Sequence, residues 1–189
     1  FMGEYLSERP DYTKVDAITF RKGKSVVSTE RGSLPPMDSL PFPYTYLEVE
    51  SDKIIYYEST RGCPFRCAYC ISSLNGGVRA VSLNRLRRDI AYLVYKGVKQ
   101  VKFIDRTFNY DKKRANSFWQ YLIDKDNGTT NFHFEICGDM LDEETFKILS
   151  KARKGLFQFV IGVQSVNPYT LKEINRNNTT DAVLTNVKR

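Results

Sequence analysis

From Ile54 onward, short apolar runs alternate with stretches of helical period, and this alternation limits the fold more than any other feature of the sequence. Strands are predicted at four runs rich in β-branched and aromatic residues, namely Ile54 to Ser59, Val98 to Ile104, Asn131 to Cys137 and Leu156 to Val163. Runs of such continuous apolar character are typical of parallel strands that are buried on both faces. Four strand-then-helix units with short connections require right-handed crossovers, so the pattern predicts an α/β fold with a parallel sheet.

The helices that follow these strands are predicted from their capping residues. N-caps are expected at Ser82, Asp111, Asp142 and Asn167. Gly97 stands where a glycine commonly ends a helix, and Pro168 takes the first helical position of the fourth helix. Thr180 begins a further helical stretch. In such sheets, ligands bind beyond the carboxyl ends of the strands, so a site is expected in the loops there.

The first 53 residues lack this regularity. Residues 15–20 and 25–29 are predicted to pair as a hairpin, and a proline-rich stretch at residues 31–46 follows. We expect residues 1–53 to be an arm that links to an upstream domain, and residues 54–189 to be the core. At 189 residues the chain is shorter than the roughly 250 residues of a complete eight-fold βα barrel, so we expect a truncated, partial barrel.

The composition excludes a membrane protein and gives little support to a nucleic-acid partner. Mean hydropathy is -0.44 and no apolar run approaches about 18 residues, so no membrane span is expected. The sequence does not open with a charged segment followed by an apolar one, and we therefore expect a cytoplasmic protein. The net charge is +7, but the basic residues are scattered. A solvated basic surface is favoured over nucleic-acid binding, which the charge nonetheless permits.

Three of the four cysteines, Cys63, Cys67 and Cys70, follow the first predicted strand with the spacing C-x3-C-x2-C. Such uneven placement does not suit a disulfide scaffold and indicates a metal site. Cysteine thiolates hold iron-sulfur clusters, and a set of three would leave one iron open for a catalytic role. The alternative is structural zinc with His133 or Cys137 as the fourth ligand, although the spacing differs from that of zinc ribbons.

The motif C-x3-C-x-aromatic-C directly after the first strand, with Tyr69 as the aromatic residue, resembles the signature of the radical S-adenosylmethionine (radical SAM) superfamily. The resemblance implies a TIM-like barrel and a [4Fe-4S] cluster on Cys63, Cys67 and Cys70, with S-adenosylmethionine bound at the fourth iron. It further implies that an electron from the cluster cleaves S-adenosylmethionine reductively to a 5′-deoxyadenosyl radical. On this basis the expected partners are a small-molecule substrate and a one-electron donor such as flavodoxin or ferredoxin.

The ends of the later strands supply the other expected contacts to S-adenosylmethionine, besides that of Tyr69. Asp105 stands where many members of the family have a glycine-glycine-glutamate segment. Glu135 shares one face of the third strand with His133 and Cys137. A carboxylate that points into a barrel is costly unless it binds something, so Glu135 is a candidate ligand contact. Cys137 is expected to be a small core residue, and His133 is given no role.

The segment Gly162-Val163-Gln164-Ser165, with an arginine twelve residues after the glutamine, resembles that of the oxygen-independent coproporphyrinogen oxidase branch of the superfamily. By this resemblance, Gln164 contacts the ribose region of S-adenosylmethionine. Arg176 pairs with the carboxylate of S-adenosylmethionine, a bidentate task that suits guanidinium geometry. No catalytic residue is assigned.

Residues 58–65 and 103–109 resemble the class of radical SAM enzymes that carry a cobalamin-binding domain. That class includes the anaerobic magnesium-protoporphyrin monomethyl ester oxidative cyclase and cobalamin-dependent methylases. The chain has one histidine and no D-x-H-x-x-G motif, so a cobalamin role is expected only in a full-length protein. Two alternatives stay open, namely a methylthiotransferase or RNA-modifying radical SAM enzyme, and a non-catalytic zinc or iron-sulfur binding module.

Overall fold

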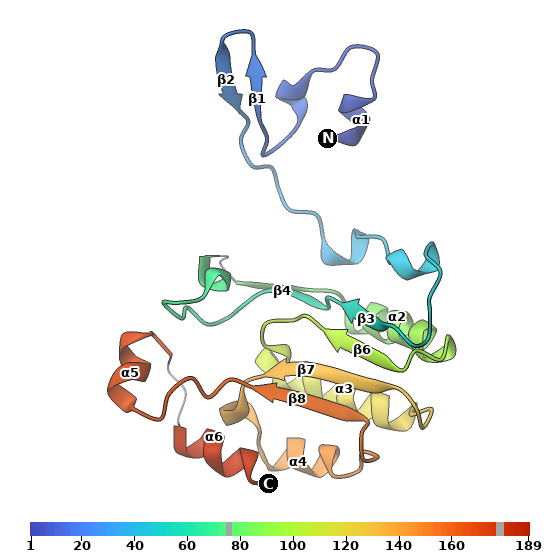
Figure 1. Ribbon diagram of the computed structural model, residues 1–189, viewed down its shortest axis with the longest axis vertical. Helices are drawn as coiled ribbons and strands as arrows, with labels where there is room; N and C mark the ends of the chain where they lie inside the picture. Colours follow the sequence, from blue (N-terminus) through green and yellow to red (C-terminus); the bar gives the residue numbers. More distant parts are fainter. Residues whose placement is uncertain (75–76, 177–179) are drawn as a thin grey trace. The chain divides into compact units, whose positions relative to one another are not determined.

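The computed structural model describes residues 1–74, 77–176 and 180–189, and the chain forms two compact units, Phe1–Pro36 and Met37–Arg189 (Figure 1). The division falls before residue 53, where the sequence pattern places the end of the arm. The second unit therefore includes residues that the sequence analysis assigns to a linker.

The first unit is built around the predicted hairpin. It contains the helix α1 (Met2–Tyr5) and the antiparallel strands β1 (Thr19–Lys22) and β2 (Ser25–Ser28). A two-residue turn joins these strands, and Gly23 supplies the positive φ of 63° that such a turn uses. The hairpin prediction is confirmed, but the first strand begins at Thr19 and extends to Lys22, beyond the predicted run of residues 15–20.

Four parallel strands form the sheet of the second unit, in the order β3-β6-β7-β8. Their bounds are β3 (Ile54–Tyr57), β6 (Gln100–Phe103), β7 (Asn131–Ile136) and β8 (Phe157–Ile161). Because every neighbouring pair is parallel, the carboxyl ends of all four strands meet at one edge of the sheet (Figure 1). The structure confirms the predicted α/β fold.

The helices begin at the predicted capping residues. They are α2 (Leu83–Tyr95), α3 (Lys112–Asp124), α4 (Glu143–Leu149), α5 (Pro168–Glu173) and α6 (Thr180–Val187). Each of the four predicted N-caps accepts a hydrogen bond from a backbone amide in the first turn of its helix. Gly97 follows α2 with a φ of 70°, as a helix-ending glycine should. In the described part of the chain, no helix is both long and apolar enough to cross a membrane.

Aromatic side chains on one face of the sheet form the centre of the core. The ring of Phe134 on β7 lies 4.6 Å from that of Phe103 on β6 and 4.4 Å from that of Phe108, between centroids. Phe118 and Trp119 of α3 cover these rings and are themselves almost fully buried. This face is therefore the one against which the helices pack, and the opposite face carries the side chains of the alternate residues.

A second, smaller sheet was not predicted from the sequence. The short strands β4 (Thr60–Gly62) and β5 (Val78–Ala80) pair antiparallel and lie before and after the cysteine loop. Gly62 has a φ of 102°, and a Cβ there would lie 2.2 Å from the carbonyl oxygen of Gly77. Only glycine fits this close approach, so Gly62 fixes the start of the cysteine loop against the backbone of Gly77, just before β5.

Residues 37–53 belong to the second unit, and several of their side chains pack on the core. Met37 is buried in the core cluster, and Leu40, Phe42 and Tyr44 pack against it. The Asp38 carboxylate accepts a hydrogen bond of 2.7 Å from the amide of Ser82 at the start of α2. The proline-rich composition correctly excludes strands and long helices, but it gives no sign that the apolar side chains between the prolines are anchors.

The aromatic core yields the first prediction. Phe134→Ala should lower the free energy of unfolding by about 3–5 kcal/mol, because it removes a fully buried ring from the centre of the cluster. Val160→Ala on β8 is the control, since Val160 is 45% exposed and should cost less than about 1 kcal/mol. Urea denaturation followed by circular dichroism measures both, and equal losses would contradict this account of the core.

Candidate functional site

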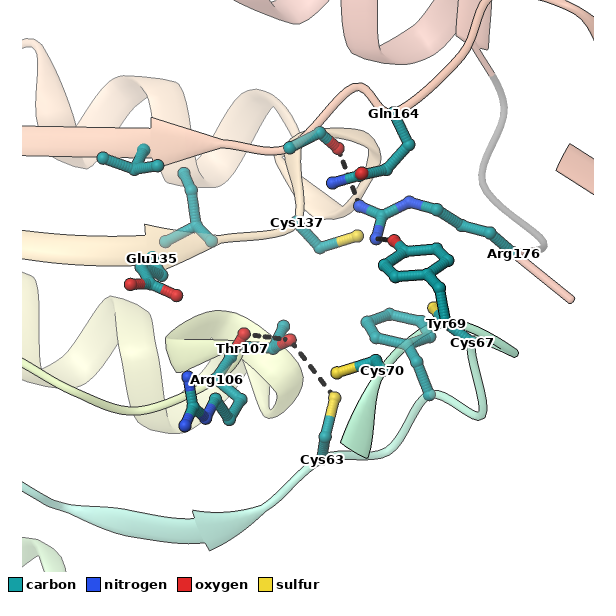
Figure 2. A pocket seen from close by; sticks show the side chains of 14 residues that line it. Cys63, Cys67, Tyr69, Cys70, Arg106, Thr107, Glu135, Cys137, Gln164 and Arg176 are labelled. Atoms are coloured by element: carbon teal, nitrogen blue, oxygen red, sulfur yellow. Dashed lines mark hydrogen bonds between the residues drawn. The ribbon is translucent and has the colours of Figure 1, made fainter. Parts of the chain in front are cut away.

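A cavity of about 330 Å³ opens at the carboxyl ends of the strands (Figure 2). The described residues that line it are Cys63, Phe65, Cys67, Tyr69, Cys70, Arg106, Thr107, Glu135, Ile136, Cys137, Val160, Gly162, Gln164 and Arg176. The structure thus brings together all three cysteines of the motif and four of the five predicted S-adenosylmethionine contacts. These residues come from segments more than a hundred positions apart in the sequence.

The cysteine loop runs from β4 to a short helical turn at Ile71–Leu74. Cys67 is buried, Cys63 and Cys70 are partly exposed, and no disulfide joins the described cysteines. The loop is fastened to the end of α5, because the amide of Ala68 donates a 2.9 Å hydrogen bond to the carbonyl of Ile174. The side-chain amide of Asn175 donates a second one, of 2.8 Å, to the carbonyl of Arg66. The loop and the segment that leads to Arg176 therefore hold each other in place.

The Arg176 guanidinium lies along the wall of the cavity. Its Nη2 donates a 2.7 Å hydrogen bond to the carbonyl of Gly162, and its Nη1 donates one of 3.3 Å to the hydroxyl of Tyr69. Its Nε is buried and has no hydrogen-bond partner within the described residues. A buried donor without a partner is costly, so it marks a place where a ligand oxygen can be received.

Gln164 lies in the loop that follows β8 and lines the same cavity (Figure 2). Its φ of 66° is in the left-handed region, which a residue other than glycine seldom adopts. Strain of this kind is kept where the surrounding structure needs a side chain in one position. The predicted ribose contact thus belongs to a segment whose backbone is held in an unusual conformation beside Arg176.

Cys137 lines the same cavity as the three motif cysteines, whereas His133 does not. Burial raises the pKa of Cys137 to about 12, and the Asp139 carboxylate, which accepts a 2.9 Å hydrogen bond from the thiol, adds to this effect. Cys137 is therefore a protonated thiol at neutral pH. His133 is buried and does not line the cavity, and burial lowers its pKa. Among residues 1–74, 77–176 and 180–189, no group of three or more His, Cys, Asp or Glu side chains could hold a single metal ion.

Asp105 lies in the interior of the protein and not in the cavity, where its position after a predicted strand suggests it. It is fully buried, it does not line the cavity, and its carboxylate accepts hydrogen bonds from the amide and hydroxyl of Ser59 and from the hydroxyl of Thr60. Burial raises the pKa of Asp105, and these donors act against the rise. The expected contact between Asp105 and S-adenosylmethionine does not fit this geometry, because both carboxylate oxygens are already used inside the protein.

Arg106 and Thr107 reach the cavity from this strand end instead. The Thr107 hydroxyl lies 3.7 Å from the sulfur of Cys63 and donates a 2.8 Å hydrogen bond to the carbonyl of Arg106. Neither residue was predicted from the sequence, although both follow Asp105 directly. Their signal was their position in the loop after a predicted strand, where ligands of parallel sheets bind.

The donor set fits an iron-sulfur cluster with an amino-acid ligand beside it. Three cysteine thiols line a single cavity, and cysteine thiolates are the usual ligands of iron-sulfur clusters. Arg176 and Glu135 provide opposite charges in the same cavity. These are the charges that the carboxylate and ammonium groups of an amino acid require.

The role of Asp105 yields a stability prediction. Asp105→Ala should lower the free energy of unfolding by about 3 kcal/mol or more, because it leaves buried donors of Ser59 and Thr60 without an acceptor. Asp105→Asn keeps one acceptor oxygen and should lose less. Denaturation by urea checks both variants, and a near-neutral Asp105→Ala would show that the carboxylate does not hold these strands together.

The thiols should differ in reactivity. At pH 8.5, iodoacetamide is expected to modify Cys63 before Cys137, because Cys137 is buried and its pKa near 12 leaves almost no thiolate. Peptide mass spectrometry over time gives the order of modification, and the same reaction in urea should remove the difference. Early modification of Cys137 in the folded chain would contradict its description as a core thiol.

Comparison with known proteins agrees with this geometry. Residues 57–189 match the family model described as the Radical SAM superfamily. An uncharacterized methyltransferase of Pyrococcus horikoshii is 31% identical over 58% of this chain and 26% of its own length. The ribosomal protein uS12 methylthiotransferase RimO of Chlamydia abortus is 24% identical over 82% of this chain and 34% of its own length. The chain thus spans between about a quarter and a third of the length of these two relatives.

Two further proteins are similar to this chain, one in sequence and one in fold. The cobalamin-dependent radical SAM methyltransferase TokK of Streptomyces tokunonensis is 28% identical over 54% of this chain and 17% of its own length. The structure of the radical S-adenosylmethionine methyltransferase TsrM of Kitasatospora setae, with tryptophan substrate and a SAM analog bound, superposes with a TM-score of 0.69 at 12% identity. That match covers 94% of this chain and 39% of the other, and it supports the fold alone.

The family implies an enzyme that uses a [4Fe-4S] cluster and S-adenosylmethionine, and the cysteine loop of this chain faces a cavity suited to both. From the family match over most of its length and from the arrangement of these residues, the chain belongs to the Radical SAM superfamily.

Proposed function

We propose that this chain is the cluster-binding core of a methyl-transferring radical SAM enzyme of the cobalamin-associated class. The observation that carries the proposal is the single cavity into which the three motif cysteines, Glu135 and Arg176 all project. The methyltransferases named above support the methyl-transfer part. They give no support to the oxidative cyclase that the sequence resemblance also suggested.

In this proposal Cys63, Cys67 and Cys70 hold the cluster, and S-adenosylmethionine lies beside it in the cavity. Once bound, the cluster supplies the electron that cleaves S-adenosylmethionine. Arg176 receives the carboxylate of S-adenosylmethionine, and Glu135 accepts hydrogen bonds from its ammonium or hydroxyl groups. A one-electron donor such as flavodoxin or ferredoxin, a small-molecule substrate and cobalamin in the full-length protein complete the proposal.

In this proposal, the side chains of Gln164 and Tyr69 position S-adenosylmethionine. Gln164 lies within the cavity next to Arg176, where its amide can bond to the ribose hydroxyls of S-adenosylmethionine. The Tyr69 hydroxyl accepts a hydrogen bond from Arg176 and thereby directs the guanidinium along the cavity wall. Both side chains thus orient the cofactor instead of reacting with it.

A methylthiotransferase is the second candidate, because the RimO protein of Chlamydia abortus aligns with a larger share of this chain than the two methyltransferases named above. The two candidates differ in the group that the substrate receives. Transfer of a methyl group adds one carbon, whereas transfer of a methylthio group adds a sulfur as well, and mass spectrometry of the product separates them.

Cluster assembly tests the proposal. After anaerobic reconstitution, the chain should hold about four iron and four sulfide, and a reductant should convert S-adenosylmethionine to 5′-deoxyadenosine and methionine. Cys67→Ala should lose the cluster and the cleavage, whereas the matched control Cys137→Ala should keep the iron content. Stoichiometric zinc without cleavage would overturn the proposal.

The role of Arg176 is tested by binding. Arg176→Met should weaken S-adenosylmethionine binding to the reconstituted chain about tenfold, since it removes a charge-assisted contact to a carboxylate. Arg176→Lys should restore only part of the affinity, because an ammonium lacks the two-point geometry of guanidinium. Lys172→Met on the exposed side of α5 is the control, and calorimetry measures all three. An unchanged affinity in Arg176→Met would remove Arg176 from the site.

A further inference from the structure

A second cavity, of about 530 Å³, adjoins the first on the face of the sheet opposite the aromatic core. It is lined by Tyr56 on β3, by Lys102 on β6 and by Ile104 just after β6. Two further side chains, those of Arg106 and Glu135, line both cavities. In Figure 2 these two shared side chains lie at the end of the first cavity away from Arg176. A molecule in the second cavity would therefore lie next to S-adenosylmethionine in the first, with Arg106 and Glu135 at the boundary between them.

One row of the sheet face that forms part of this cavity is polar. It consists of residues in register across the four strands, namely Tyr56, Lys102, His133 and Gln158. In closed βα barrels the inward layers are mostly Val, Ile and Leu, which fill the interior. Tyr56 and Lys102 of this row line the cavity, whereas His133 and Gln158 do not. A lysine in the row is unsuited to such packing, and it indicates a place that receives a polar ligand.

The charges around the second cavity are not balanced within the protein. Glu58 and Arg61 form an ion pair with each other, in which the Arg61 Nε donates a 3.1 Å hydrogen bond to a Glu58 oxygen. By contrast, the side chains of Lys102 and Arg106 make no hydrogen bond or ion pair with any described residue. Two cations without partners thus face one space.

Glu135 does not neutralise these two cations. It lies at the boundary of the cavities, and it forms no ion pair with Lys102 or Arg106 in the described part of the chain. In the proposed function, on which this inference rests, its carboxylate is used by S-adenosylmethionine. The second cavity then keeps a net positive charge on Lys102 and Arg106, and a cavity of one sign attracts ligands of the other.

We propose that the second cavity is the substrate site and that Lys102 and Arg106 bind an oxyanion of the substrate, a carboxylate or a phosphate. Arg106 gives the planar, two-point contact that suits either group, and Lys102 adds a point charge from β6, the strand whose end leads to Arg106. The bound anion would hold the rest of a small molecule over the boundary with the first cavity. The substrate class is therefore an anionic small molecule.

Anion binding to the chain tests this site without any turnover. Inorganic phosphate and, separately, acetate are titrated by calorimetry into the reconstituted chain saturated with S-adenosylmethionine and into the chain as isolated. Lys102→Met and Arg106→Met should each weaken the better-bound anion at least tenfold, and Lys102→Arg should restore most of the affinity. Lys113→Met, an exposed lysine at the start of α3, should leave binding unchanged.

Each outcome decides the proposal. Tighter binding of phosphate or of acetate supports it and identifies the anion class. No binding of either probe overturns it, as does an equal loss in Lys113→Met, which would mean non-specific attraction to a basic surface. A loss in Arg106→Met with none in Lys102→Met also overturns it, because the anion would then belong to the cofactor cavity.

The same samples separate this inference from the proposed function. Absence of S-adenosylmethionine cleavage in the unsubstituted chain would contradict the proposed function, while anion binding stays measurable in the chain as isolated. Intact cleavage without anion binding would contradict only the substrate site. Circular dichroism of Lys102→Met and Lys102→Arg confirms that both variants are folded.

Discussion

The buried carboxylate of Asp105 is the interaction on which the position of the cysteine loop depends. It joins the end of β6 to Ser59 and Thr60, the residues at which the chain leaves β3 and enters β4. The loop with the three cysteines begins only three residues later. A chain that must place three sulfurs around one cluster needs a rigid origin for the loop, and a carboxylate with three donors supplies it in the interior, where such bonds are strongest.

The rest of the site is built outward from this fixed point. Gly62 allows β4 to pass close to the backbone of Gly77, and the loop then closes against the end of α5 through Ala68 and Asn175. The aromatic core behind the sheet keeps the four strand ends in register, so that Glu135 stays opposite the cysteines. Stability and function thus occupy opposite faces of the same strands.

Features encoded by neighbouring residues could be predicted from the sequence, and features that depend on distant partners could not. N-caps such as Ser82 and Asp142 act within three residues, and the apolar runs of β6 and β7 need only burial. The cysteine motif was predicted from its spacing and Glu135 from the cost of burying a carboxylate, whereas the role of Arg176 was predicted from a resemblance. The roles of Asp105, Arg106 and Thr107 were not predicted, since a strand-end carboxylate looks the same in the sequence whether it faces a ligand or a buried hydroxyl.

The bonds between the cysteine loop and the end of α5 have a thermodynamic consequence. Ala68 and Asn175 join the segment that would carry the metal centre to the segment that carries Arg176. Any ligand that orders one segment lowers the conformational entropy still to be lost when the other is ordered. In the proposed function, occupancy of the two halves of the site would therefore be linked, and by reciprocity each cofactor would raise the affinity for the other to the same degree.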